Sequence, residues 1–328
     1  MLYDQLFKVL PIVLIIPLAY CLKKMKLFDK DFSVPLNKIF IDLSLPASVF
    51  LAFASITLTL DLLKLPLYGF LVVFLLMLIG FVVVFIVRPK KNIYTVFLVM
   101  LPAMATAVVA YPFFIELYGQ QGLAVIALIN VGNVFFLFTF DRYLSYKLAN
   151  KKPSSKQYFF SFIETPSIWA IVLGLLFSYF AIRHMLFDKF FEIIANATVF
   201  ITMFSIGLSF EYDGKIIKQA LPLVLIKTGA GLLAGYAIVT LFNLEGLSRL
   251  AIMVYSIVPA SAVVFAFVTE DKLDKVFCAD LLSIALPLGA LLVAGIMIFP
   301  NIMQTVYVLP VGAALFIMGL LSMVLFDK

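Results

Sequence analysis

The feature that most constrains this chain is a series of continuous apolar runs, each about 20 residues long. An α-helix of that length crosses the hydrocarbon core of a bilayer. The runs show no alternation with a period of two residues, which argues against a transmembrane barrel. Charged residues make up only 13% of the chain, compared with about 25% in soluble domains. Because backbone groups must pair with one another in lipid, the chain is predicted to be an all-α integral membrane protein.

About ten to eleven membrane helices are expected, with ends accurate to a few residues. The first run, from Leu6 to Leu22, follows no basic segment and contains no small-x-small cleavage site. We therefore expect a retained helix and not a cleaved signal. The expected spans are 5–24, 36–60, 66–88, 93–118, 122–146, 159–183, 188–211, 218–243, 247–269, 274–299 and 303–326.

Basic residues gather in alternate loops, and this pattern predicts the topology. Cytoplasmic loops carry an excess of Lys and Arg, so the N-terminus is predicted outside and the C-terminus in the cytoplasm. We expect a multi-pass protein of the plasma (cell) membrane, such as a bacterial inner membrane. The formal net charge of +6 then reflects topology and not a nucleic-acid partner. The residues concerned are Lys23, Lys24, Lys26, Lys30, Lys38, Arg88, Lys90, Lys91, Arg142, Lys147, Lys151, Lys152, Lys156, Lys215, Lys218, Lys272, Lys275 and Lys328, against Lys8, Lys64, Arg183, Lys189 and Arg249 on the other side.

Two pairs of segments predict an internal repeat. Residues 48–58 (SVFLAFASITL) align with residues 198–208 (TVFITMFSIGL), and residues 106–109 (TAVV) align with residues 261–264 (SAVV). The members of each pair lie five spans apart, so the second copy would insert upside down, as in the inverted repeats of many secondary transporters. The alternative is chance similarity between apolar segments of low complexity.

The repeat divides the chain into four parts. Residues 1–147 form a first five-helix repeat, and residues 159–300 form a second, inverted one. Residues 148–158 are a polar cytoplasmic linker, and residues 301–328 are an additional C-terminal transmembrane helix.

Prolines inside two corresponding spans predict broken helices. Proline lacks the backbone N–H and clashes with the preceding turn. Pro259 is followed by the small residues Ala260 and Ser261, while Pro102 and Pro112 flank another stretch of small residues. Transporters of this kind bind their substrates near the midplane, beside such breaks. The alternative is an ordinary kink in a packed bundle.

Several short motifs, in this order and spacing, resemble the auxin efflux carrier family, which is distantly similar to the bile acid–sodium symporters. The resemblance covers most of residues 5–300. The motifs are Leu45-Pro-Ala47, Tyr118-Gly119, Ala170–Leu175 (AIVLGL), Ser205–Leu208 (SIGL) and Val258–Glu270 (VPASAVVFAFVTE).

The resemblance implies ten helices in two inverted five-helix repeats. The fourth and ninth helices would cross at their breaks, with the substrate beside the crossing. One arm of this crossover would be Pro259, Ala260 and Ser261, and the other would be Met104, Ala105 and Thr106.

The sequence departs from the family pattern in the first arm. The family usually has proline then asparagine where Met104 and Ala105 stand, and glycine where Ala110 stands. The family also offers a polar residue from the fifth helix, for which Asn130 or Asn133 could serve. The eleventh helix is a further departure.

Polar residues inside membrane spans are costly and are therefore further candidates. Lys227 would be a substrate counter-charge or half of a proton-linked pair, or would extend to the headgroups. Asp280 is a second charge candidate, nearer the interface. Pro46 and Ser48 in the second helix, mirrored by Asn196 and Thr198 in the seventh, would line a cavity or join helices by hydrogen bonds.

Glycine spacing indicates close helix packing. Gly231 and Gly235 form a GxxxG motif, which we assign to packing within the bundle ahead of dimerisation. Gly312 and Gly319 lie seven residues apart in the last helix, where oligomer packing is one interpretation.

The predicted function is secondary active transport of a small organic anion, such as a carboxylate, by alternating access. The alternatives are a sodium-coupled symporter of the bile-acid type, for which the chain offers few oxygen ligands, and a channel or receptor. An enzyme is not expected, because the chain has one histidine, His184, and no HExxH or P-loop motif. We expect no cofactor and no metal site, proton coupling ahead of sodium coupling, a lipid bilayer around the chain and a homodimer as its assembly.

Overall fold

A computed structural model gives the fold and describes residues 2–57, 59–151, 166–182, 184–304 and 307–326. Within these ranges the regular structure is entirely helical, and seven helices are long and apolar enough to cross a membrane. Four shorter apolar helices accompany them. The prediction of an all-α integral membrane protein is confirmed.

The first half of the chain holds five spans, of which the fourth is interrupted. The second span changes between α, 3-10 and π geometry along its length, and the fifth contains a π-turn near its end. The elements are α1 (Leu2–Lys24), η1 (Lys30–Phe32), α2 (Ser33–Ile39), η2 (Phe40–Ser44), α3 (Leu45–Ser55), α4 (Leu60–Val87), α5 (Lys91–Met100), α6 (Thr106–Val109), α7 (Tyr111–Phe136), η3 (Leu137–Asp141) and α8 (Arg142–Leu148).

The second half also contains long helices and an interrupted one, and its last described helix is α17 (Val308–Phe326), while the division into two inverted repeats stays a prediction. Its elements are α10 (Pro166–Tyr179), α11 (Met185–Ala195), α12 (Ala197–Ser209), α13 (Gly214–Leu241), α14 (Gly246–Ile257), α15 (Val263–Glu270), α16 (Lys275–Ile298), η4 (Pro300–Gln304) and α17 (Val308–Phe326).

Several predicted boundaries were wrong, and local structure explains two of them. The second span ends at Ser55 and not at residue 60, because the chain is extended at Ile56. The third span begins at Leu60 and not at residue 66, because the Thr59 hydroxyl accepts a hydrogen bond from the Leu62 N–H and caps the helix. Pro66 therefore lies inside α4 and does not start it.

The fourth and fifth spans meet at Gly119. Its φ of 61° lies in the left-handed region, which glycine adopts without a steric penalty, so the chain turns there inside the α7 range. The linker 148–158 and the span 159–183 fall partly outside the described residues, as do Lys152, Lys156, Arg183 and Lys328 of the topology argument.

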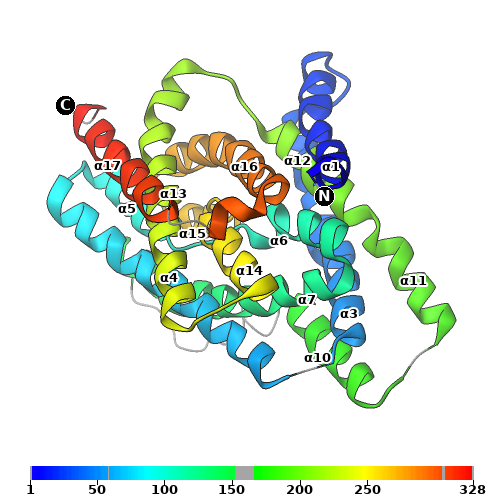
Figure 1. Cartoon of the computed structure of the whole chain (residues 1–328). Helices are drawn as coiled ribbons and strands as arrows, with labels where there is room; N and C mark the ends of the chain where they lie inside the picture. The colour runs from blue at the N-terminus through cyan, green and yellow to red at the C-terminus, as the bar shows by residue number, and fades with distance from the viewer. Residues whose placement is uncertain (1, 58, 152–165, 183, 305–306, 327–328) are drawn as a thin grey trace.

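The helices pack in two groups, which Figure 1 shows on opposite sides of the view. The panel group consists of α1, α2, α3, α10, α11 and α12, in which α10 packs on α3 and α1 packs on α12. The crossover group consists of α4 to α8 and α13 to α16, in which α4 packs on α7 and α13 packs on α14. The division into panel and crossover groups does not follow the two halves of the chain, because each group takes helices from both.

The loops rich in basic residues lie together at one end of the bundle, called here the basic end. Lys30 after the first span pairs with Glu211 after the seventh at 2.7 Å. Asn92 after the third span donates to Asp274 after the ninth at 3.4 Å. Contacts between loops that are remote in sequence therefore place them on one side, while the side of the membrane they face stays a prediction.

Glycines let several helices approach to backbone contact. A Cβ at Gly231 would overlap the Ser256 carbonyl oxygen, and one at Gly235 would overlap the Ser256 side chain, so this GxxxG motif packs α13 against α14. Gly312 and Gly319 in α17 lie against α13. The Gly312 and Gly319 face is therefore used inside the chain and is not free for a second copy; a homodimer through another face stays a prediction.

We predict that Gly231→Ala lowers the thermal unfolding temperature in detergent, because the added methyl group has no room beside Ser256. Overpacking of this kind costs about 1–3 kcal/mol. Gly295→Ala in α16 is the matched control, since nothing lies within 4 Å of its added Cβ. Equal unfolding temperatures for the two variants would contradict the close packing of α13 and α14.

Candidate functional site

Two interrupted helices cross in the middle of the crossover group. The fourth span stops at Met100 and resumes at Thr106, and the ninth stops at Ile257 and resumes at Val263. At the crossing the Ala105 N–H donates a hydrogen bond to the Pro259 carbonyl oxygen at 2.9 Å. The family resemblance implied crossover arms at Met104 to Thr106 and at Pro259 to Ser261, and the structure brings these segments together.

Asn133 in α7 holds the first break in shape. Its side-chain oxygen accepts from the Met104 N–H at 3.3 Å, and its amide nitrogen donates to the Met104 carbonyl oxygen at 3.1 Å. The same nitrogen donates to Asn130, which in turn donates to the Tyr111 hydroxyl at 3.2 Å. Asn133 is 3% exposed. Both candidate asparagines are therefore engaged with protein groups, and Asn133 replaces helical hydrogen bonds that the break removes.

Lys227 in α13 places its ammonium group on the same break. Nζ donates to the carbonyl oxygens of Leu101 at 2.6 Å and Ala103 at 2.9 Å, and the Met100 carbonyl lies at 3.5 Å. These carbonyls end a helix, where partners are missing and the dipole favours a cation. Lys227 is only 7% exposed, so its side chain points into the bundle and does not extend to the headgroups.

A small cavity of about 30 Å³ lies beside the crossing, with Lys227, Pro259 and Ala260 in its wall. It has room for water but not for an organic anion. Gly289 in α16 closes it from another side, because a Cβ there would overlap the Pro259 ring. The crossing is therefore tightly packed in this conformation.

A larger cavity of about 440 Å³ opens at the basic end. Lys90, Asp274 and the half-buried Asp280 contribute to its lining. Leu223 lines both this cavity and the small one beside the crossing. Asp280 thus lines the cavity at the basic end and does not line the cavity beside the crossing.

The two hydroxyl candidates at the crossing differ in their partners. Ser261 accepts a hydrogen bond from the Val263 N–H at 3.3 Å and so caps α15. Thr106 is 1% exposed, and within the described residues its hydroxyl oxygen has no hydrogen-bond partner. Thr106 opens the second half of the fourth span, so its unpaired hydroxyl lies next to the N–H groups that begin a helix.

The candidates from the second and seventh spans form a separate cluster. The hydroxyl oxygens of Ser48 and Thr198 lie 2.8 Å apart, and both groups donate to the Ser44 carbonyl oxygen. Pro46 is half-buried in the first turn of α3, and Asn196 is exposed at the junction of α11 and α12. Ser48 and Thr198 therefore join two helices of the panel group.

Sequence reasoning missed Asp141, the last residue of the π-turn η3. It is fully buried, and within the described residues neither carboxylate oxygen has a hydrogen-bond partner. Asp141 precedes Arg142 near the end of an expected span, so the two resembled an interfacial pair. The spacing of eight residues from Asn133 was a signal that Asp141 faces the same interior side of the helix.

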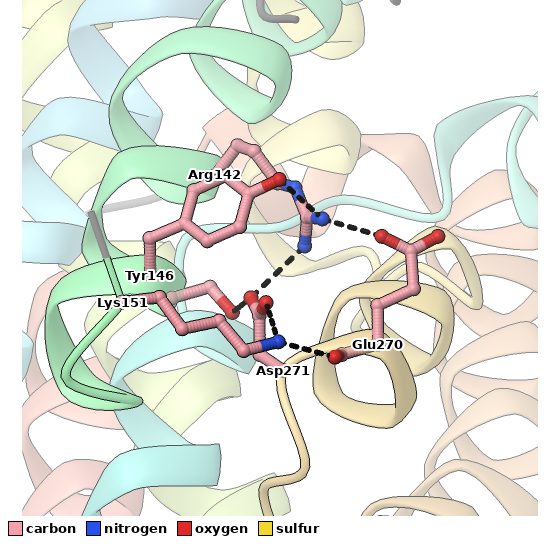
Figure 2. Close-up of polar contacts among 6 residues, drawn as sticks. Arg142, Tyr146, Lys151, Glu270 and Asp271 are labelled. Atoms are coloured by element: carbon pink, nitrogen blue, oxygen red, sulfur yellow. Dashed lines mark hydrogen bonds and ion pairs between the residues drawn. The ribbon is translucent and has the colours of Figure 1, made fainter. Parts of the chain in front are cut away.

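A network of ion pairs ties the fifth span to the end of α15, as Figure 2 shows. Asp271 is completely buried and accepts from Arg142 at 3.0 Å, from Lys151 at 3.1 Å and from the Ser145 hydroxyl. Arg142 also pairs with Glu270, whose side chain is 62% exposed. The half-helix α15 is thus fixed at the crossing by its start and at the basic end by its final residues.

We predict that Asp271→Asn and Glu270→Gln differ sharply in their effect on stability. Asp271→Asn leaves Arg142 and Lys151 without their buried counter-charge, and breaking a buried pair costs about 3–5 kcal/mol. Glu270→Gln removes an exposed pair worth about 0–1 kcal/mol. Thermal unfolding in detergent measures both variants. Similar unfolding temperatures would show that the buried carboxylate does not hold α15 in place.

Comparison with known proteins gives two matches. Residues 5–157 match a family model described as membrane transport protein. An uncharacterized transporter of Methanocaldococcus jannaschii is 22% identical over 303 residues, covering 87% of this chain and 96% of the relative. Both matches agree with the apolar helices and with the motifs that resemble the auxin efflux carriers. The chain is a membrane transporter similar to the auxin efflux carriers.

Proposed function

We propose that this protein is a secondary active transporter that moves a small organic anion, such as a carboxylate, across the membrane by alternating access. The observation that supports this most directly is the backbone hydrogen bond between the two breaks, from Ala105 to Pro259. Irregular backbone at membrane depth is tolerated only where it is buried in protein or lines a cavity, and in transporters it marks the binding site.

The chemistry of the breaks favours an anion. The fourth and ninth spans each resume as a new helix just after the crossing, at Thr106 and Val263. The first N–H groups of a helix lack partners within it and carry partial positive charge. The unpaired hydroxyl of Thr106 lies on the first of these helices, where it can donate to a carboxylate oxygen. Ser261 can do the same from the second.

The position of the crossing supports alternating access. The short helix α6 contacts α12 of the panel group as well as α16 of its own group. A substrate bound beside Thr106 would therefore lie at the boundary between the two groups. Movement of the crossover group against the panel group would expose this boundary first to one side of the membrane and then to the other.

The alternative of a sodium-coupled symporter is disfavoured by Lys227. Transporters of that type bind sodium with unwound backbone carbonyls at helix breaks. Here the carbonyl oxygens of Leu101 and Ala103 accept hydrogen bonds from the Lys227 ammonium. A covalently attached cation thus occupies carbonyls that sodium would need, so we propose proton coupling.

We predict that proteoliposomes with purified protein take up labelled malate, malonate or indole-3-acetate saturably. Ser261→Trp fills the space beside the crossing and should lower this uptake at least about tenfold, which corresponds to about 1.4 kcal/mol. Phe85→Trp is the matched control, because Phe85 is 75% exposed on α4 and its ring would face lipid.

The outcomes separate the fold from the substrate. Uptake that Ser261→Trp leaves intact would move the binding site away from the crossing. Absence of flux for every carboxylate, with the protein folded by size-exclusion chromatography, would leave the fold standing and overturn the organic-anion assignment.

A further inference from the structure

Asp141 is a buried acid with an unusual environment. Its side chain is fully buried in the crossover group, and both carboxylate oxygens lack a hydrogen-bond partner within the residues that the structure describes. Burying a charge without a partner is costly, and an acid inside a membrane span is kept for a function more often than for packing. Asp141 also ends a π-turn, an irregularity that is frequent at functional sites.

The charged groups that act on Asp141 are Lys227 from α13 and Arg142 from its own helix. Arg142 has other partners, because its guanidinium group pairs with Asp271 and Glu270 at the basic end. Lys227 donates to the carbonyl groups of the first break. The charge of Lys227 therefore acts on Asp141, while its ammonium group donates hydrogen bonds to the carbonyl groups of the break.

Two arrangements would lower the cost of burying this carboxyl group. In one, Asp141 carries a proton and is neutral, and the ammonium group of Lys227 stays on the carbonyls of Leu101 and Ala103. In the other, Asp141 is ionised and the ammonium group turns toward it, which removes the cation from the break. The charge of Asp141 then biases the geometry of the crossing, as a coupling residue requires.

We infer that Asp141 is the proton-binding site of this carrier and that Lys227 transmits its charge state to the crossover. The inference rests on the proposed transport function. In the binding step a hydronium ion gives its proton to a carboxylate oxygen of Asp141, which leaves a neutral carboxyl group and a water molecule. No oxidation or reduction takes place.

The cavity of about 440 Å³ at the basic end and the cavity of about 30 Å³ beside Lys227 share Leu223 in their walls. On this proposal, protons approach Lys227 from the basic end, past Leu223.

The test compares two reactions of the same reconstituted protein. Counterflow exchanges labelled for unlabelled carboxylate at equal pH on both sides, and it needs substrate binding and movement of the helix groups but no net proton transfer. Accumulation against a concentration gradient, driven by an imposed pH gradient, needs proton coupling as well. The probe is whichever of malate, malonate and indole-3-acetate the unmodified protein exchanges.

We expect Asp141→Asn to retain counterflow and to lose pH-driven accumulation, because the amide resembles the protonated acid in shape and charge but binds no proton. Asp141→Glu should recover part of the accumulation. Asp42→Asn is the matched control, because Asp42 is exposed in η2 of the panel group, and it should keep both reactions. A pH-sensitive dye inside the vesicles should report proton entry with substrate for the unmodified protein and none for Asp141→Asn.

Three results would overturn this inference. Accumulation by Asp141→Asn equal to that of the unmodified protein would exclude Asp141 as the proton site. Loss of counterflow together with accumulation, in a variant that stays folded, would assign Asp141 to substrate binding or structure. If only a sodium gradient drives accumulation by the unmodified protein, the transport is not coupled to protons. Absence of counterflow in the unmodified protein is a separate outcome, which contradicts the proposed function.

Discussion

The structure depends on how two broken helices satisfy their backbone groups at membrane depth. A break releases N–H and C=O groups that water cannot reach, and each must find a partner within the protein. The Ala105 N–H finds the Pro259 carbonyl, Asn133 takes both backbone groups of Met104, and Lys227 takes the carbonyl groups at the end of α5. These partners come from the ninth, fifth and eighth spans. The crossing is therefore the point at which the two halves of the chain are joined.

The ends of α15 explain how the crossing could move as one body. Its start follows Pro259 at the crossing, and the residues at its end pair with Arg142 of the fifth span and with Lys151 just after it. The fifth span also carries Asn133, which holds the other break. The fifth span and the turn that follows it thus hold both interrupted spans, one at the crossing and one at the basic end. The proposed alternating access would then move the crossover group as one body against the panel group.

Sequence reasoning located the helices and breaks because these follow from local chemistry. Apolar runs of membrane length predict spans, and proline among small residues predicts the break at Pro259. The start of the third span at Leu60 was not predicted, because it depends on a cap at Thr59 and the helix continues through Pro66. Long-range partners could not be predicted, because hydropathy does not say which helices touch. The sequence therefore identified Lys227 as a charge inside a span but not its carbonyl partners. Asp141 was missed because it precedes Arg142, which pairs with Asp271 and Glu270 and not with Asp141.

The Lys227 ammonium group at the break limits how transport can be coupled to an ion. A sodium ion that binds at helix breaks can dissociate, so its binding and release can be coupled to the conformation of the carrier. Lys227 cannot leave, so its contribution to the crossing can change only if its charge or its position changes. A position change needs a second place for an ammonium group, and within the described residues Asp141 is a buried carboxylate without a hydrogen-bond partner. On the proposal that Asp141 binds the proton, its protonation decides where the ammonium group of Lys227 lies.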